Sequence, residues 1–380
     1  MTQAAEVVEF HETENNSFMI KHKLLNKYIK VGRREADYLK LLISHPEDSE
    51  RERLYQGELT EKERRYLMEK FEEWGFLQTE AEEMPAKKRD MTLIKLFRFN
   101  PNRWLEKNLY IIRILLHPVA VAAYGLLMLG ALYMMMSDPD LVNRISLNGI
   151  GIKEGLILYL MMIATTAFHE MSHAAVCKKY GGSVPETGVM LFYFGPAMFC
   201  DVSSTYLFKK KRHKLAVLFA GIYSQWMMTA ISAITFYGLL QAGIEAPLLL
   251  YYSIANLGMS LLNLIPLVKL DGYWMLCHSL GIVNLRQKAF RAVFSKILPR
   301  SKRKDGMKAN AERPFEKRVL LLYGIAAAAF TPLFWGWGIY QLIDRLQPYL
   351  GMFAYAAASI LLIMLAVHAM KFWRTLRETV

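Results

Sequence analysis

The chain has 380 residues, of which 53% are hydrophobic, and a mean hydropathy of +0.15, which is too apolar for an ordinary soluble protein. Its formal net charge is +13, yet residues 1–90 carry 16 basic and 20 acidic side chains and are therefore net negative. The positive charge is concentrated beside the apolar segments that follow, which is typical of a multi-pass membrane protein and excludes a nucleic-acid-binding surface. The three cysteines, Cys177, Cys200 and Cys277, lack paired spacing, so buried free thiols are expected.

Residues 1–90 are predicted to form a small cytosolic domain. Met1–Asn16 is polar and acidic and lacks the apolar core of a signal peptide. From Ser17 to Val31, apolar residues alternate with lysines as they do in strands, and Leu25–Lys27 can supply the turn. The domain is therefore expected to contain a β-hairpin.

Two amphipathic helices are predicted after this hairpin. The first covers about Arg34–Ser44, and the second begins at Thr60, where Glu63 completes a capping box. Hairpin and helices together predict a small α+β, winged-helix-like fold, followed by a charged segment over 80–90 and a linker over 91–109. The second helix is expected to bury Tyr66, Leu67, Phe71 and Trp74.

Six segments are apolar and long enough to cross a membrane as helices. The third follows the basic run 209–214, and the fourth precedes a basic loop at 281–318, so both of these loops are expected in the cytosol. Basic residues before the first span and after the last one place both termini in the cytosol as well. Within the loop at 281–318, Arg286–Leu298 has an apolar face that includes Phe290 and Val293, and it is predicted to be an interfacial helix on anionic lipid. The predicted spans are residues 110–136, 156–178, 215–240, 247–268, 319–343 and 353–370, the last two forming a C-terminal segment over 319–380.

The second predicted span contains the pattern His-Glu-x-x-His at residues 169–173. Positions four apart lie on one helix face, so His169 and His173 can bind the same Zn²⁺, while Glu170, about 100° around the helix, can face water at the metal. The alternative is a chance match, but ionisable groups in hydrocarbon are costly without a partner. The pattern therefore predicts a zinc peptidase site inside a membrane helix.

The apolar stretch Gly188–Phe208 is too interrupted for a spanning helix, because it contains Gly195, Pro196, Asp201 and several hydroxyl side chains. It is predicted to be a re-entrant hairpin or strand that enters from the cytosol beside the zinc-site helix. An edge strand there could receive an extended substrate, with Gly195 and Pro196 in contact with it. The alternative is a cytosolic loop packed on the membrane surface.

A zinc site with two histidines needs a third protein ligand. Asp271, at the cytosolic end of the fourth span, is the candidate, because His169 and His173 lie roughly 8 to 14 Å below the cytosolic end of their own helix at about 1.5 Å rise per residue. The alternative roles are an N-cap of the next helix for Asp271 and an interhelical hydrogen bond for the nearby Asn263.

The HExxH pattern, followed by N-x-x-P-x-x-x-L-D-G at residues 263–272, resembles the site-2 protease (M50-type) class of intramembrane zinc metalloproteases over residues 110–280. The PDZ and CBS domains of many members are not visible here, so substrate gating is expected to differ. The resemblance implies zinc ligands at His169, His173 and Asp271, a general base at Glu170, and a role for Asn263 in holding the substrate carbonyl or its oxyanion.

The N-terminal domain resembles the PqqD-type peptide-recognition elements that accompany enzymes maturing ribosomally made peptides. In that fold a peptide adds as a strand beside the hairpin, so Ser17–Val31 is expected to capture the substrate peptide. The alternative is a scaffold or partner-docking domain. A peptide-modifying enzyme or transporter from the same gene cluster is an expected partner.

The expected fold is an all-α polytopic membrane protein of about six spans with a re-entrant hairpin, joined to a small α+β cytosolic domain. The expected function is zinc-dependent hydrolysis of a membrane-associated or ribosomally made peptide, with the active site near the cytosolic face. The alternative is a membrane peptide-binding, export or immunity accessory protein with a structural or vestigial zinc site. Glu170 argues against that alternative, because a structural zinc site does not need it.

Overall fold

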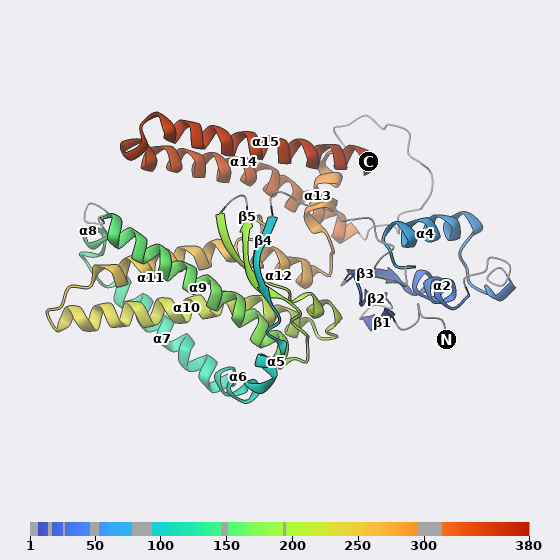
Figure 1. Ribbon diagram of the computed structural model, residues 1–380, viewed down its shortest axis with the longest axis horizontal. Helices are drawn as coiled ribbons and strands as arrows, with labels where there is room; N and C mark the ends of the chain where they lie inside the picture. The colour runs from blue at the N-terminus through green and yellow to red at the C-terminus, as the bar shows by residue number, and fades with distance from the viewer. Residues whose placement is uncertain are drawn as a thin grey trace. The chain divides into compact units, whose positions relative to one another are not determined.

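In the computed structural model, the described residues are 7–13, 17–25, 27–45, 53–77, 93–145, 151–192, 195–294 and 314–379 (Figure 1). The chain forms two units, Met1–Leu264 and Ile265–Val380, each of which is considered by itself. The predicted charged segment over 80–90, the hairpin residues Tyr193 and Phe194, and the end of the predicted interfacial helix after Phe294 lie outside the described residues.

The N-terminal domain is a three-stranded antiparallel sheet packed against two helices. The predicted hairpin and both predicted helices are present. Strand β1 was not predicted, because its apolar residues Val8 and Phe10 alternate with charged ones in a segment that is polar and acidic as a whole. The strands, in the order β1-β2-β3, are β1 (Val8–Thr13), β2 (Ser17–His22) and β3 (Lys27–Gly32), and the helices are α2 (Arg33–Ser44) and α4 (Glu61–Glu73).

The core of this domain is apolar. Ile20, Leu39 and Phe71 are fully buried where the sheet meets the helices. Helix α4 begins with the predicted capping box: the Glu63 N–H donates to Thr60 Oγ1 at 3.4 Å, and the Thr60 N–H donates to Glu63 Oε2 at 2.8 Å. The local sequence therefore determines where α4 starts, and the apolar stripe determines how it packs.

Two side chains of the α4 region depart from the prediction. Tyr66 is 40% exposed and Trp74 is 38% exposed, whereas Leu67 and Phe71 are buried. Tyr66 lies about 100° around the helix from Leu67, and Trp74 lies at the C-cap, where the helix has ended. Their predicted burial is therefore wrong.

A second antiparallel sheet joins segments that are far apart in the chain. Strand β4 (Leu93–Phe99) pairs with β5 (Thr187–Phe192), which pairs with β6 (Gly195–Cys200), and the short helix η3 (Ser203–Leu207) follows. The hairpin predicted within residues 188–208 is therefore present as β5 and β6, while its entry into a membrane stays a prediction. Strand β4 and helix α5 (Asn102–Lys107) occupy the segment for which a linker was predicted.

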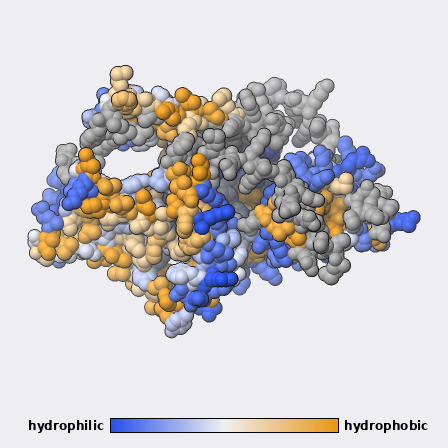
Figure 2. Space-filling view, in the orientation of Figure 1, coloured by the Kyte–Doolittle hydropathy of each residue, from blue (hydrophilic) through white to orange (hydrophobic). Residues whose placement is uncertain are grey.

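Five helices among the described residues are long and apolar enough to cross a membrane. In Figure 2, hydrophobic colour dominates over α7, α9, α10 and α11, whereas hydrophilic colour gathers on the N-terminal domain. The five are α7 (Pro118–Met136), α9 (Ile152–Lys179), α10 (Lys211–Gln241), α11 (Pro247–Leu264) and the part Pro314–Gln341 of α14 (Pro314–Leu350).

The first predicted span begins earlier than the corresponding helix of the structure. Helix α6 (Leu109–Leu115) ends before α7, which begins with Pro118 in its first turn. Proline disfavours helical geometry in the residue before it and lacks the N–H that a continuous helix needs. The sixth predicted span falls within helix α15 (Met352–Thr379), whose apolar part among the fully described residues is Met352–Val367, so that its crossing of a membrane stays a prediction.

Helix α10 is the central helix of the first unit. It packs against α7, α9 and α11. In its apolar 18-residue stretch, 61% is buried, compared with 17% of the corresponding stretch of α7 and 11% of that of α9. The buried surface between α10 and α11 is unusually polar, because Gln225, Thr229, Ser253, Asn256 and Ser260 are each at most 1% exposed. Polar groups in such a setting need partners.

In the second unit, α12 (Asp271–Leu280), α13 (Leu285–Phe294) and α14 form a compact core. Phe290 of α13 is buried in it, and Val293 lies against Gly324 of α14, which has no side chain to hold the helices apart. The prediction that this apolar face rests on lipid is therefore wrong for Phe290 and Val293. A helix with one apolar stripe packs equally well on protein or lipid, and its sequence does not distinguish the two.

Candidate metal centre

The two histidines of the HExxH pattern converge on one point. His169 and His173 lie one turn apart on α9, are 6% and 4% exposed, and have their Nε2 atoms 3.0 Å apart. Two nitrogens on one tetrahedral Zn²⁺ are separated by about 3.3 Å, given Zn–N distances of about 2.0–2.1 Å. The pair therefore has nearly the spacing that a shared metal requires.

The backbone of α10 orients one of these rings. His173 Nδ1 lies 2.6 Å from the carbonyl oxygen of Val217, to which it donates. This bond leaves the Nε2 lone pair of His173 directed at His169 and available to a metal, which is the usual arrangement behind a metal-binding imidazole.

Gly221 of α10 leaves room at the same point. A Cβ atom on Gly221 would lie 2.4 Å from His169 Nε2 and 2.5 Å from His173 Nε2, closer than real Cβ contacts. Any side chain there would displace the imidazoles or fill the space between them. Glycine at this helix position therefore permits the close approach of α10 to the two nitrogens.

Asp271 completes a group that could hold a metal ion. It is the first residue of α12, and one of its carboxylate oxygens lies with one nitrogen of each histidine, all within 4.8 Å of one another. The alternative of an N-cap does not apply, because Leu270 occupies that position and α12 has no side-chain cap. Two imidazoles and one carboxylate are a donor set that suits zinc.

Glu170 follows His169 on α9 and is half-buried. Burial raises the pKa of the Cys200 thiol at the end of β6, and the negative charge of Glu170 raises it further. Strand β6 also packs against α9. The carboxylate of the predicted general base is therefore near enough to β6 to affect the Cys200 thiol.

Strand β6 is the outer strand of the second sheet among the residues described, since it pairs only with β5. The Asp201 N–H donates to the Glu186 carbonyl at 2.8 Å. Hydrogen-bonded and non-hydrogen-bonded residue pairs alternate along two antiparallel strands. The backbone N–H and C=O groups of Met198 and Cys200 therefore point away from β5. This edge can accept an extended chain.

The predicted substrate-binding residues Gly195 and Pro196 are at the other end of β6. Gly195 pairs with Phe192 next to the hairpin turn, and Pro196 is exposed. Pro196 lies four residues from Cys200, which is about 14 Å along a strand. The contact of Gly195 and Pro196 with substrate stays a prediction.

Asn263, near the end of α11, makes the interhelical hydrogen bond that was the alternative to a substrate role. Its Nδ2 donates to Gln225 Oε1 at 3.2 Å, and Asn263 itself is half-buried. The bond places its carboxamide on the face of α10 that also carries Gly221, one turn earlier. The two roles are compatible, because an amide has further donor and acceptor sites.

Sequence reasoning missed three residues of α10, namely Val217, Gly221 and Gln225. Only Gln225 had a local signal, since a polar amide in an apolar span is uncommon and points to a functional or packing role. Val217 acts through its backbone carbonyl, and Gly221 acts through its lack of a side chain. Neither feature can be detected from the hydropathy of the sequence.

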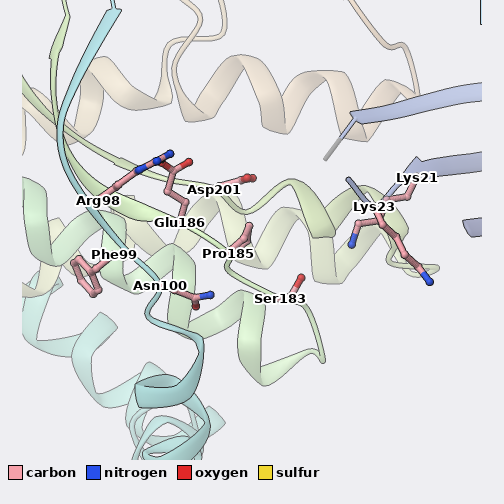
Figure 3. Close-up of a pocket in the computed structure, with 9 residues that line it drawn as sticks. All are labelled: Lys21, Lys23, Arg98, Phe99, Asn100, Ser183, Pro185, Glu186 and Asp201. Carbon is pink, nitrogen blue, oxygen red and sulfur yellow. The ribbon is translucent and has the colours of Figure 1, made fainter. Parts of the chain in front are cut away.

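A cavity of about 560 Å³ lies within the first unit. In Figure 3, Arg98 and Glu186 point toward each other, at 3.6 Å, while Lys21 and Lys23 extend from the N-terminal domain. Burial raises the pKa of Tyr28 on β3, and the charge of Asp201 adds to that effect. The cavity is lined by Lys21, Lys23, Arg98, Phe99, Asn100, Ser183, Pro185, Glu186 and Asp201.

The chain was compared with protein-family models, with curated proteins and with solved structures, and nothing matched in any of the three.

Proposed function

We propose that this protein is an intramembrane zinc endopeptidase of the site-2 protease type. The observation that carries the proposal is the convergence of His169, His173 and Asp271 within 4.8 Å, next to a half-buried Glu170, in a chain with five apolar spans. A structural metal site would need the first three residues only. Glu170 adds the base that hydrolysis needs.

Zn²⁺ at this centre would polarise the scissile carbonyl and make water more acidic. Glu170 takes a proton from the attacking water and passes it to the leaving amine, which is the role of a carboxylate held beside a reacting bond. The low polarity of the surrounding helices strengthens these interactions and restricts competing water. His173 keeps its orientation through Val217.

The substrate binds as an extended strand on β6. The backbone groups of Met198 and Cys200 are directed outward there, and Cys200 is close enough to Glu170 for the carboxylate to affect its pKa. Strand addition uses the backbone of the peptide, so it exposes the scissile bond with little dependence on side chains. A helical substrate segment would need to unwind before it could bind in this way.

The N-terminal domain recognises the same peptide before cleavage. Its β3 is an outer strand, with pairing only to β2 among the described residues, and is available for a further strand. The cavity with Lys21 and Lys23 joins this domain to the end of β6, where Asp201 follows Cys200. A peptide held at β3 is thereby brought near the catalytic residues, with both termini of the enzyme in the cytosol.

The test combines metal content with catalysis. Purified protein should hold about one zinc per chain, and His169→Ala, His173→Ala and Asp271→Ala should each lose it. Glu170→Gln should retain zinc but lower cleavage at least about a hundredfold, the usual worth of a general base. Cleavage is measured on small peptides encoded beside the gene and expressed together with the enzyme. Wild-type cleavage by Glu170→Gln would refute hydrolysis as the function.

A further inference from the structure

A pair of carboxamides connects the metal-site face of α10 to α11. Gln225 lies one turn beyond Gly221, so both residues are on the same side of α10. Gln225 is 1% exposed, and its Oε1 accepts the hydrogen bond from Asn263 Nδ2 at 3.2 Å. The amide nitrogen of Asn263 is therefore held at the interface between the two helices.

The other polar contacts between these helices serve association. Asn256 Nδ2 donates to the Gln225 carbonyl at 2.9 Å, and Trp226 Nε1 donates to Ser260 Oγ at 3.0 Å. Two buried side-chain atoms at this interface, Gln225 Nε2 and Asn256 Oδ1, make no hydrogen bond to any residue that the structure describes. A buried amide that leaves a donor unused is unfavourable. Helix association alone does not explain why this position is glutamine.

We propose that Gln225 is a positioning residue that orients Asn263 toward the backbone of a bound peptide. This inference rests on the proposed peptidase function. The carboxamide is planar, so anchoring Nδ2 at Gln225 directs Oδ1 away from it, where Oδ1 accepts a hydrogen bond from a peptide N–H. The resemblance implied a role at the carbonyl or oxyanion, whereas the Gln225 contact assigns Asn263 the role of an acceptor for the peptide backbone.

The test compares two probes on zinc-loaded protein purified in detergent. Acetohydroxamic acid reaches only the metal, whereas a peptidyl hydroxamate also presents a peptide backbone. Gln225→Met, of similar length, should raise the Kd of the peptidyl hydroxamate up to about tenfold, the effect of one lost hydrogen bond. Zinc content and the Kd of acetohydroxamic acid should not change.

A double-mutant cycle separates positioning from general damage. Asn263→Ala should weaken binding of the peptidyl hydroxamate as Gln225→Met does. The double variant should bind this probe no more weakly than Asn263→Ala does, because both residues act through one contact. Gln225→Glu retains an acceptor for Asn263 Nδ2 and should bind both probes as the wild type does. If Gln225→Met does not fold, the Gln225→Glu variant still tests whether an acceptor at this position is sufficient for normal binding.

Ser260→Ala is the matched control, because it removes an equally buried contact between α10 and α11 but does not touch Asn263. It should bind both probes normally. Unchanged peptidyl binding by Gln225→Met, or additive losses in the double variant, would overturn the inference while leaving the peptidase proposal intact. Failure of acetohydroxamic acid to bind the wild type would overturn the metal centre, and this inference with it.

Discussion

The N-terminal domain and the helices α9, α10 and α11 differ in how many polar side chains they bury. In the domain, Ile20, Leu39 and Phe71 are fully buried and the charged residues are outside. Between the helices, Gln225 and Asn256 are at most 1% exposed and lie among buried apolar residues such as Ile222 and Leu250. Burial of apolar area stabilises the domain in water. In a membrane, helices gain little from apolar burial against one another, so polar contacts and close packing specify their association.

This difference means that buried residues carry different information in the two regions. A buried apolar residue of the domain is explained by stability. A buried polar residue of the helices calls for a partner or a function, as His169 and His173 illustrate. Substitutions of buried residues should therefore have different effects in the two regions. In the N-terminal domain they should lower stability, and in the helices they should weaken ligand binding.

The largest effect is expected in the apolar core. Phe71→Ala should destabilise the N-terminal domain by about 3 to 5 kcal/mol, because a fully buried aromatic ring leaves a cavity. Limited proteolysis should then cut the domain, while zinc per chain stays unchanged. Trp74→Ala, at a 38% exposed position on the same helix end, is the control and should resist proteolysis. Loss of zinc in Phe71→Ala would contradict the separation of the two regions.

The reverse effect is expected at Gly221. Gly221→Leu should weaken zinc binding about 10- to 100-fold, because the new side chain occupies the space between the two histidine nitrogens. Zinc is measured by mass spectrometry after competition with a chelator. Gly238→Leu is the matched control on α10, since a Cβ there meets nothing within 4 Å. If both variants retain zinc, the site does not use Nε2 of the histidines.

The smallest effect concerns the proximity of Glu170 to β6. Burial and the Glu170 carboxylate both raise the pKa of Cys200, so the thiol should react slowly with iodoacetamide at pH 8. Glu170→Gln removes a negative charge, lowers that pKa and increases the thiolate fraction, so alkylation should accelerate about twofold or more.

The labelling is performed with Cys177→Ala and Cys277→Ala, so that only Cys200 reacts. Glu154→Gln, at the start of α9, is the charge-matched control and should leave the rate unchanged. Equal rates for wild type and Glu170→Gln would place the carboxylate away from β6 and weaken the assignment of that strand as the substrate edge.

Local patterns account for much of the fold. The hairpin of β2 and β3, the capping box of α4 and four of the five spans follow from residue periodicity, composition and turn chemistry over short windows. The HExxH pattern belongs to this class as well, because its geometry is set by a single helix. Asp271 was accessible to sequence reasoning through its motif and the need for a third ligand.

The sequence by itself determined that this is a chain of apolar helices with a histidine pair on one of them and a small charged domain ahead of them. Tertiary structure decided which surfaces meet: β4 pairs with β5, α13 covers α14, and Gly221 and Gln225 of α10 approach the histidines and Asn263. The physical reason is that hydropathy measures how strongly a side chain tends to be buried, but does not show which distant residue it packs against. Close approach at a glycine and pairing between remote strands depend on contacts that no local window contains.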